Sequence, residues 1–170
     1  MNVSEVRKGL DQFEAHYGYD TTFLKEMLSH DPEGYAHFQA FMPMASHRMK
    51  LEVDVYYVAK LATMAAEDCG ACLQLNIKMA LEAGVPKHLV EAAVKGGGDL
   101  PEDLGQIHAY ATRVTLNNPD RGELLELLQQ RLDKGAMSEL ALCIASARMF
   151  PSLKRSLGYD KSCQVMQFAI

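Results

Sequence analysis

Apolar residues recur along most of the chain at the three- and four-residue spacing of helices, and almost no stretch alternates with a period of two. After Thr21 or Thr22, either of which can cap a helix, Phe23, Leu24 and Met27 begin one such apolar stripe. The pattern predicts helices over residues 4–16, 21–29, 32–43, 47–67, 69–81, 86–95, 101–116, 124–132 and 137–149. We therefore expect an all-α fold.

Proline residues are expected to set several of the helix boundaries. Asp31 can cap a helix that starts at Pro32, because the fixed φ of proline suits the first helical position, and Pro43 is expected to end that helix. Pro151 is expected to stop the last strongly apolar helix. That helix and the region 55–81 are predicted to form the centre of the core.

The composition is that of an ordinary globular chain. Its 170 residues are 48% hydrophobic and 23% charged, which suits one domain over residues 1–170 without a disulfide or metal staple. A net charge of −5 argues against binding to nucleic acid or to anionic lipid, since both need clustered lysine and arginine. Residues 160–170 are weakly specified, and we expect either a docked tail or an arm for another subunit.

The start of the chain and its most apolar stretch bear on where the protein works. Residues 1–7 contain no apolar signal core, and the most apolar helical stretch, residues 55–66, is interrupted by Lys60. We therefore expect a cytoplasmic protein with no membrane partner.

The candidate chemistry centres on Cys69 and Cys72 in a Cys-Gly-Ala-Cys segment. Residues three apart share one face of a helix, so the two sulfurs can close a short disulfide ring. With Asp68 as the predicted N-cap, both thiols lie where backbone N–H groups and the helix dipole favour a thiolate. The carboxylates of Glu67 and Asp68 act in the opposite direction, chiefly on Cys69. A reactive pair is the favoured hypothesis, and two small buried residues at a coincidental spacing are the alternative.

Several segments around and after the cysteines resemble one known family. They are Asp68-Cys69-Gly70-Ala71-Cys72, Met79-Ala80-Leu81-Glu82-Ala83-Gly84-Val85, Leu89-Val90-Glu91-Ala92, residues 109–115 followed by Asn117-Asn118-Pro119, and residues 139–150. These segments are similar to the carboxymuconolactone decarboxylase and alkylhydroperoxidase D family, over about residues 23–157. The resemblance implies an antiparallel helical domain of about eight helices that assembles as a homo-oligomer, either a trimer or a hexamer.

The paired cysteines resemble the peroxidase branch of that family, which implies that Cys72 attacks the substrate and that Cys69 resolves the intermediate. In that branch, a glutamate twelve residues before the first cysteine and a histidine four residues after the second relay protons to the thiols. Here Tyr57 and Asn76 stand at those positions, and Ala71 replaces a further histidine. Asparagine can only hydrogen-bond and tyrosine has an ordinary pKa of about 10, so we expect a weakened proton relay.

The remaining candidate groups are less suited to catalysis or metal binding. Cys143 stands among core positions, which favours a buried inert thiol. Cys163 lies near the end of the chain, where it either caps a redox relay or, as we favour, is a bystander. Glu33 and His37 stand at i and i+4, a spacing more typical of a surface pair than of a metal site. No second ligand pair accompanies the two neighbouring cysteines, so we expect no metal and no cofactor.

The favoured function is that of a thiol-dependent oxidoreductase, similar to peroxiredoxins and alkylhydroperoxidases. A dithiol–disulfide cycle would reduce a peroxide or a disulfide, and a thiol reductant such as a thioredoxin-like or lipoyl partner would reset it. One alternative is a non-catalytic, redox-responsive or ligand-binding oligomer. The other is carboxymuconolactone decarboxylation, which the absence of a histidine at Asn76 disfavours.

Overall fold

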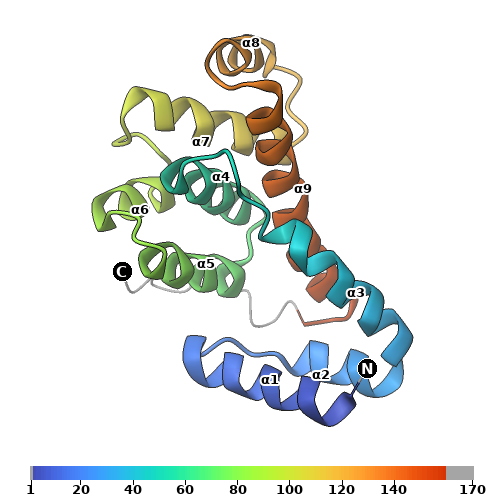
Figure 1. Ribbon diagram of the computed structural model, residues 1–170. Helices are drawn as coiled ribbons and strands as arrows, with labels where there is room; N and C mark the ends of the chain where they lie inside the picture. Colours follow the sequence, from blue (N-terminus) through green and yellow to red (C-terminus); the bar gives the residue numbers. More distant parts are fainter. Residues whose placement is uncertain (1, 160–170) are drawn as a thin grey trace.

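The computed structural model describes residues 2–159, and within this range the chain forms helices and no strand (Figure 1). The helices are α1 (Val3–Tyr17), α2 (Thr22–His30), α3 (Pro32–Ala45), α4 (Val53–Ala66), α5 (Gly70–Glu82), α6 (Lys87–Val94), α7 (Glu102–Thr115), α8 (Gly122–Arg131) and α9 (Lys134–Ser156). The predicted all-α fold is confirmed. None of these helices is both long and apolar enough to cross a membrane.

Helix α4 is the central element of the larger core. It packs against α5, α6, α7 and α9, and the run from Val58 to Met64 is buried without interruption. A helix that is apolar around its whole circumference is stable only when other elements surround it. The prediction that the region 55–81 lies at the centre is therefore confirmed, and α9 packs along α4 as the second long core helix.

The N-terminal helices form a second, smaller layer. Leu28, Tyr35 and Phe38 make a separate apolar cluster between α2 and α3. Phe150 and Leu153 of α9 pack against this cluster and against the main core. Figure 1 shows α3 lying along the C-terminal half of α9, with α1 and α2 below α5. Helix α9 thus joins the two layers.

Two predicted helix ends are wrong, because proline lies inside the helix in both cases. Helix α3 continues past Pro43 to Ala45, and α9 continues past Pro151 to Ser156. An internal proline removes one backbone hydrogen bond and disfavours the helix. At Pro151, which is itself buried, the neighbouring side chains are held by both apolar clusters, so tertiary packing outweighs the local penalty.

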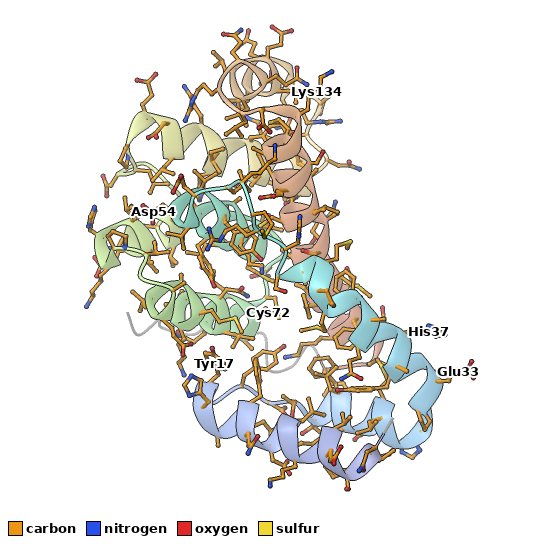
Figure 2. The ribbon with its side chains drawn as sticks, in the orientation of Figure 1. Tyr17, Glu33, His37, Asp54, Cys72 and Lys134 are labelled. Atoms are coloured by element: carbon orange, nitrogen blue, oxygen red, sulfur yellow. The ribbon has the colours of Figure 1, made fainter. Side chains whose placement is uncertain are left out.

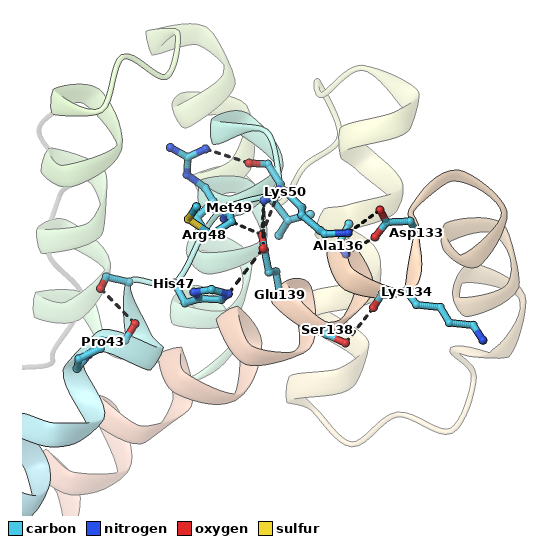
Figure 3. A network of polar contacts seen from close by, with 12 residues as sticks. Pro43, His47, Arg48, Met49, Lys50, Asp133, Lys134, Ala136, Ser138 and Glu139 are labelled. Atoms are coloured by element: carbon cyan, nitrogen blue, oxygen red, sulfur yellow. Dashed lines mark hydrogen bonds and ion pairs between the residues drawn. The ribbon is translucent and has the colours of Figure 1, made fainter.

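Helix α4 starts at Val53, six residues later than predicted, because the preceding segment binds the carboxylate of Glu139 (Figure 3). This carboxylate is 4% exposed and accepts hydrogen bonds from the backbone N–H groups of Met49, Lys50 and Leu51, at 3.1, 2.9 and 3.0 Å. Three consecutive amides that point at one carboxylate cannot also donate to helical carbonyls. Glu139, which lies 90 residues after Met49 in the chain, therefore sets the start of α4.

The substitution Glu139→Gln is expected to destabilise the fold in a pH-dependent manner. Burial raises the pKa of Glu139, but the three backbone N–H groups and His47 outweigh it and lower the pKa below the ordinary value of a glutamate. A lowered folded-state pKa stabilises the protein above the unfolded-state pKa, and this stabilisation is lost as the pH falls through the folded-state value. Urea unfolding across pH should show the largest difference from wild type near neutral pH and a smaller one in acid. The exposed control Glu126→Gln should show no such trend; equal stability of the wild type and Glu139→Gln near neutral pH would contradict this account.

Candidate active site

A cavity of about 890 Å³ lies between the two layers, and its walls come from α1 to α5 and α9. This volume lies in the range of about 300–1,000 Å³ that small-molecule sites occupy. Cys72 belongs to the wall, as do Tyr57 and Asn76, which stand at the two predicted relay positions. Figure 2 shows Tyr17 at the end of α1, extending toward α5, which carries Cys72. The structure thus brings three of the four predicted site residues to one cavity.

The turn before α5 differs from the prediction, because Asp68 ends α4 instead of capping α5. Asp68 has a left-handed φ of 51°, and its N–H donates to the carbonyl of Ala65. The N–H of Cys69 donates to the carbonyl of Met64. These two bonds around a left-handed residue form the Schellman motif that closes many helices. Cys69 is therefore the N-cap residue of α5, and Cys72 is the third residue of the helix.

The two thiols have different surroundings, although both are buried. Cys69 is 2% and Cys72 is 1% exposed. Cys72 borders the cavity, whereas Cys69 is not among the described lining residues. The Tyr19 hydroxyl lies 3.7 Å from Cys72 Sγ, within hydrogen-bond distance for sulfur. Cys72 is therefore the thiol that a molecule in the cavity would meet.

Neither residue at the relay positions is a strong proton acceptor. The Asn76 side-chain amide donates to the Cys72 carbonyl oxygen at 2.8 Å, so it braces the backbone of α5 one turn after the cysteine. Burial raises the pKa of Tyr57, which keeps its hydroxyl protonated at neutral pH. Within the cavity, both groups can orient a ligand or water by hydrogen bonding.

The carboxylate beside Cys69 is already paired. Glu67 binds Arg148 at 2.9 Å and also binds Arg155, and both arginines belong to α9. Burial raises the pKa of Glu67, but the two guanidinium groups outweigh it and lower the pKa. The paired charge of Glu67 therefore opposes thiolate formation at Cys69 less than the sequence suggested.

Two side chains of the site were not predicted from the sequence. Tyr19 lies in the loop between α1 and α2, 53 residues before Cys72, and no local pattern connects the two. Lys60 was noted only as an interruption of an apolar helix, yet it lines the cavity and is 8% exposed. The sequence signal that could have identified it is a lysine in the middle of a long apolar run, because such a run is buried and a buried lysine is rare.

Lys60 is held by neutral groups. Its Nζ donates to the carbonyl of Ala45 at 2.9 Å and to the Tyr56 hydroxyl at 2.7 Å, and it lies 4.6 Å from the centre of the Tyr56 ring. Burial lowers the pKa of Lys60 below that of an ordinary lysine.

The other candidates lie outside this cavity. Cys143 is buried as predicted, and burial raises its pKa to about 11. Glu33 and His37 are exposed at the outer edge of α3, away from Cys72 (Figure 2). Residues 2–159 contain no group of three or more His, Cys, Asp or Glu side chains placed to hold a metal ion. Cys163 and the predicted tail lie outside the described residues.

Comparison with known proteins adds no family assignment. No family model matches the chain, and neither the curated proteins nor the solved structures contain a significant match. The resemblance to the carboxymuconolactone decarboxylase and alkylhydroperoxidase D family therefore stays a prediction, and the site's own geometry carries the functional argument.

The substitution Tyr19→Phe is expected to slow alkylation of Cys72 near neutral pH. It removes a hydroxyl that can donate to the thiolate, and a single hydrogen bond contributes about 0.5–1.5 kcal/mol, so a roughly 2- to 10-fold slower reaction should follow. Iodoacetamide labelling followed by peptide mass spectrometry measures the rate. Cys143 is the internal control, because its raised pKa should keep it unmodified in both proteins. An unchanged rate at Cys72 would show that the Tyr19 hydroxyl does not act on the thiolate.

Proposed function

We propose that this protein is a thiol-dependent oxidoreductase in which Cys72 attacks and Cys69 resolves. The observation that carries the proposal is the position of Cys72, on the wall of a ligand-sized cavity, beside the Tyr19 hydroxyl and one turn after a second cysteine. Thiolates at the first turn of a helix are favoured by its unpaired N–H groups and by its dipole.

With a hydroperoxide as substrate, the cycle has two chemical steps and a reset. The Cys72 thiolate attacks the terminal peroxide oxygen, the S–O bond forms as the O–O bond breaks, and the departing alkoxide takes a proton to become an alcohol. The Cys69 thiolate then attacks the sulfenic sulfur, the S–S bond forms as the S–O bond breaks, and the departing hydroxide takes a proton to become water. An external dithiol, thioredoxin-like or lipoyl in class, reduces the disulfide by two exchanges and is itself oxidised to a disulfide.

The start of α5 suits this closure. Neighbours three apart on a helix have Cβ atoms about 5–6 Å apart, whereas a disulfide needs about 3.5–4.5 Å, so the first turn must tighten by about 1 Å. Cys69 is the N-cap residue, with a non-helical backbone (φ −111°, ψ 87°), so it lies outside the regular turns of α5. The cavity-side thiol can therefore be resolved by a local adjustment.

Proton transfer is the weak part of the proposed cycle. Tyr57 and Asn76 do not accept protons readily at neutral pH, and the Tyr19 hydroxyl can donate to a thiolate or to a leaving oxygen. We therefore expect modest turnover of peroxide. Assembly as a trimer or hexamer and a cytoplasmic location stay predictions that follow from the sequence.

Replacing each cysteine in turn separates the roles. We expect Cys72→Ser to abolish reductant-dependent peroxide consumption, because no thiolate then faces the cavity. Cys69→Ser should complete a single turnover and leave a sulfenic acid at Cys72, detectable with dimedone by mass spectrometry. Cys143→Ser is the matched control and should retain the wild-type rate.

Peroxide consumption that survives in Cys72→Ser would exclude the proposed mechanism. A wild-type rate no faster than that of free thiol, together with an oligomeric state that changes with reductant, would instead favour the redox-responsive, non-catalytic alternative.

A further inference from the structure

The cavity that holds Cys72 also contains a buried lysine, Lys60, that has no carboxylate partner among residues 2–159. The hydrogen-bonding and ring partners of the Lys60 Nζ in this range are the Ala45 carbonyl, the Tyr56 hydroxyl and the face of the Tyr56 ring. All three are uncharged, and the nearby thiol of Cys143, whose pKa burial raises to about 11, is uncharged at neutral pH as well. Removing an ammonium group from water costs several kcal/mol unless an opposite charge or excellent hydrogen bonds offset it. An apolar side chain at this position would avoid that desolvation cost, so the presence of a lysine indicates that its charge has a function.

The Lys60 ammonium can make a further bond into the cavity. An ammonium group has three hydrogens, and the described contacts use two of them. Lys60 and both of its hydrogen-bond partners belong to the cavity wall, so we infer that its remaining hydrogen faces the cavity. The group is thus placed to bind an anion by a charge-assisted hydrogen bond.

The other charged groups of the described wall do not neutralise Lys60. Glu82 is exposed, and its carboxylate accepts from the Tyr17 hydroxyl and contacts His16 at 3.2 Å. Arg48 is also exposed and donates to the Leu51 carbonyl. With Cys72 as the protonated thiol, the cavity has two cations and one carboxylate that is already engaged, which leaves an excess of positive charge in a chain of net charge −5.

Most of the remaining wall is apolar. Phe13, Phe23, Leu24, Phe38, Leu75 and Met79 all contribute side chains to it. Such a surface binds hydrocarbon, because apolar area removed from water is stabilising at about 25 cal/mol per Å². A cation in an apolar cavity fits a molecule that combines one anionic group with a hydrocarbon body.

We propose that the cavity binds an amphipathic carboxylate, with the carboxylate on Lys60 and the hydrocarbon body against the aromatic and methionine walls. In combination with the proposed function, the substrate class becomes an organic hydroperoxide that carries a carboxylate. That extension rests on the oxidoreductase proposal, whereas carboxylate binding itself does not require any reaction at Cys72.

Decanoate is a suitable probe, because it has the proposed chemistry and no reactive oxygen. Isothermal titration of the reduced full-length protein should give tighter binding of decanoate than of decanol, which has the same chain without the charge. Lys60→Met should weaken decanoate binding about tenfold or more, as expected for loss of one charge-assisted hydrogen bond, and should leave decanol binding unchanged or stronger. Lys60→Arg should restore most of the preference for decanoate.

The controls keep the result interpretable. Lys60→Met is expected to fold, because an apolar residue replaces a buried charge and the Ala45 carbonyl keeps its bond from the Tyr56 hydroxyl at 2.6 Å. Lys87→Gln removes an exposed lysine of α6 and should leave decanoate affinity unchanged. Equal affinity of the wild type for decanoate and decanol, or equal decanoate affinity of wild type and folded Lys60→Met, would overturn the proposal.

The two proposals can fail separately. If Cys72→Ser binds decanoate like the wild type while the wild type consumes no peroxide, the carboxylate site stands and the oxidoreductase proposal falls. If the wild type turns over peroxide but does not distinguish decanoate from decanol, the carboxylate site falls and the thiol chemistry stands.

Discussion

The tight reversal between α4 and α5 is the constraint on which the candidate site depends. It is built from the left-handed Asp68 and two backbone hydrogen bonds, and Glu67 fastens it to α9 through two arginines. A shift of one residue in the start of α5 would rotate its side chains by about 100°, since a helix has 3.6 residues per turn. Cys72 would then leave the cavity wall. The ion pairs of Glu67 thus help to fix which side of α5 faces the cavity.

Two buried charges in this chain are compensated in opposite ways. Glu139 receives three backbone N–H groups, so its environment holds the carboxylate charged and ties the segment before α4 to α9. Lys60, on α4, receives neutral acceptors and an aromatic face, and its pKa is lowered by burial. The hydrogen bonds of Glu139 are enough to explain why a charge is buried there, since they hold the segment before α4 in place. The incompletely compensated one borders a cavity, which is where binding and catalysis place such groups.

The sequence was sufficient for features that depend on neighbouring residues. Helical periodicity predicted the elements, and the Cys69 and Cys72 spacing singled out a pair of thiols, one of which borders the cavity. The sequence was not sufficient for features that depend on contacts between distant residues. The start of α4 depends on Glu139, and the passage of α9 through Pro151 depends on packing between two layers. Tyr19 reaches Cys72 only because α1 and α2 fold beneath α5. None of these contacts leaves a local signature.

Because Cys72 belongs both to the proposed redox pair and to the cavity wall, ligand binding would be thermodynamically linked to the thiol redox state wherever the two redox forms bind the ligand differently. Closing a Cys69–Cys72 disulfide would move Sγ of Cys72 away from its present place beside the Tyr19 hydroxyl. If the dithiol and disulfide forms differ in affinity for a ligand by some factor, that ligand must shift the equilibrium constant for disulfide reduction by the same factor. A carboxylate held at Lys60 could therefore shift the dithiol–disulfide equilibrium without contacting the cysteines. The same linkage operates whether the pair turns over substrate or only reports the redox state of its surroundings.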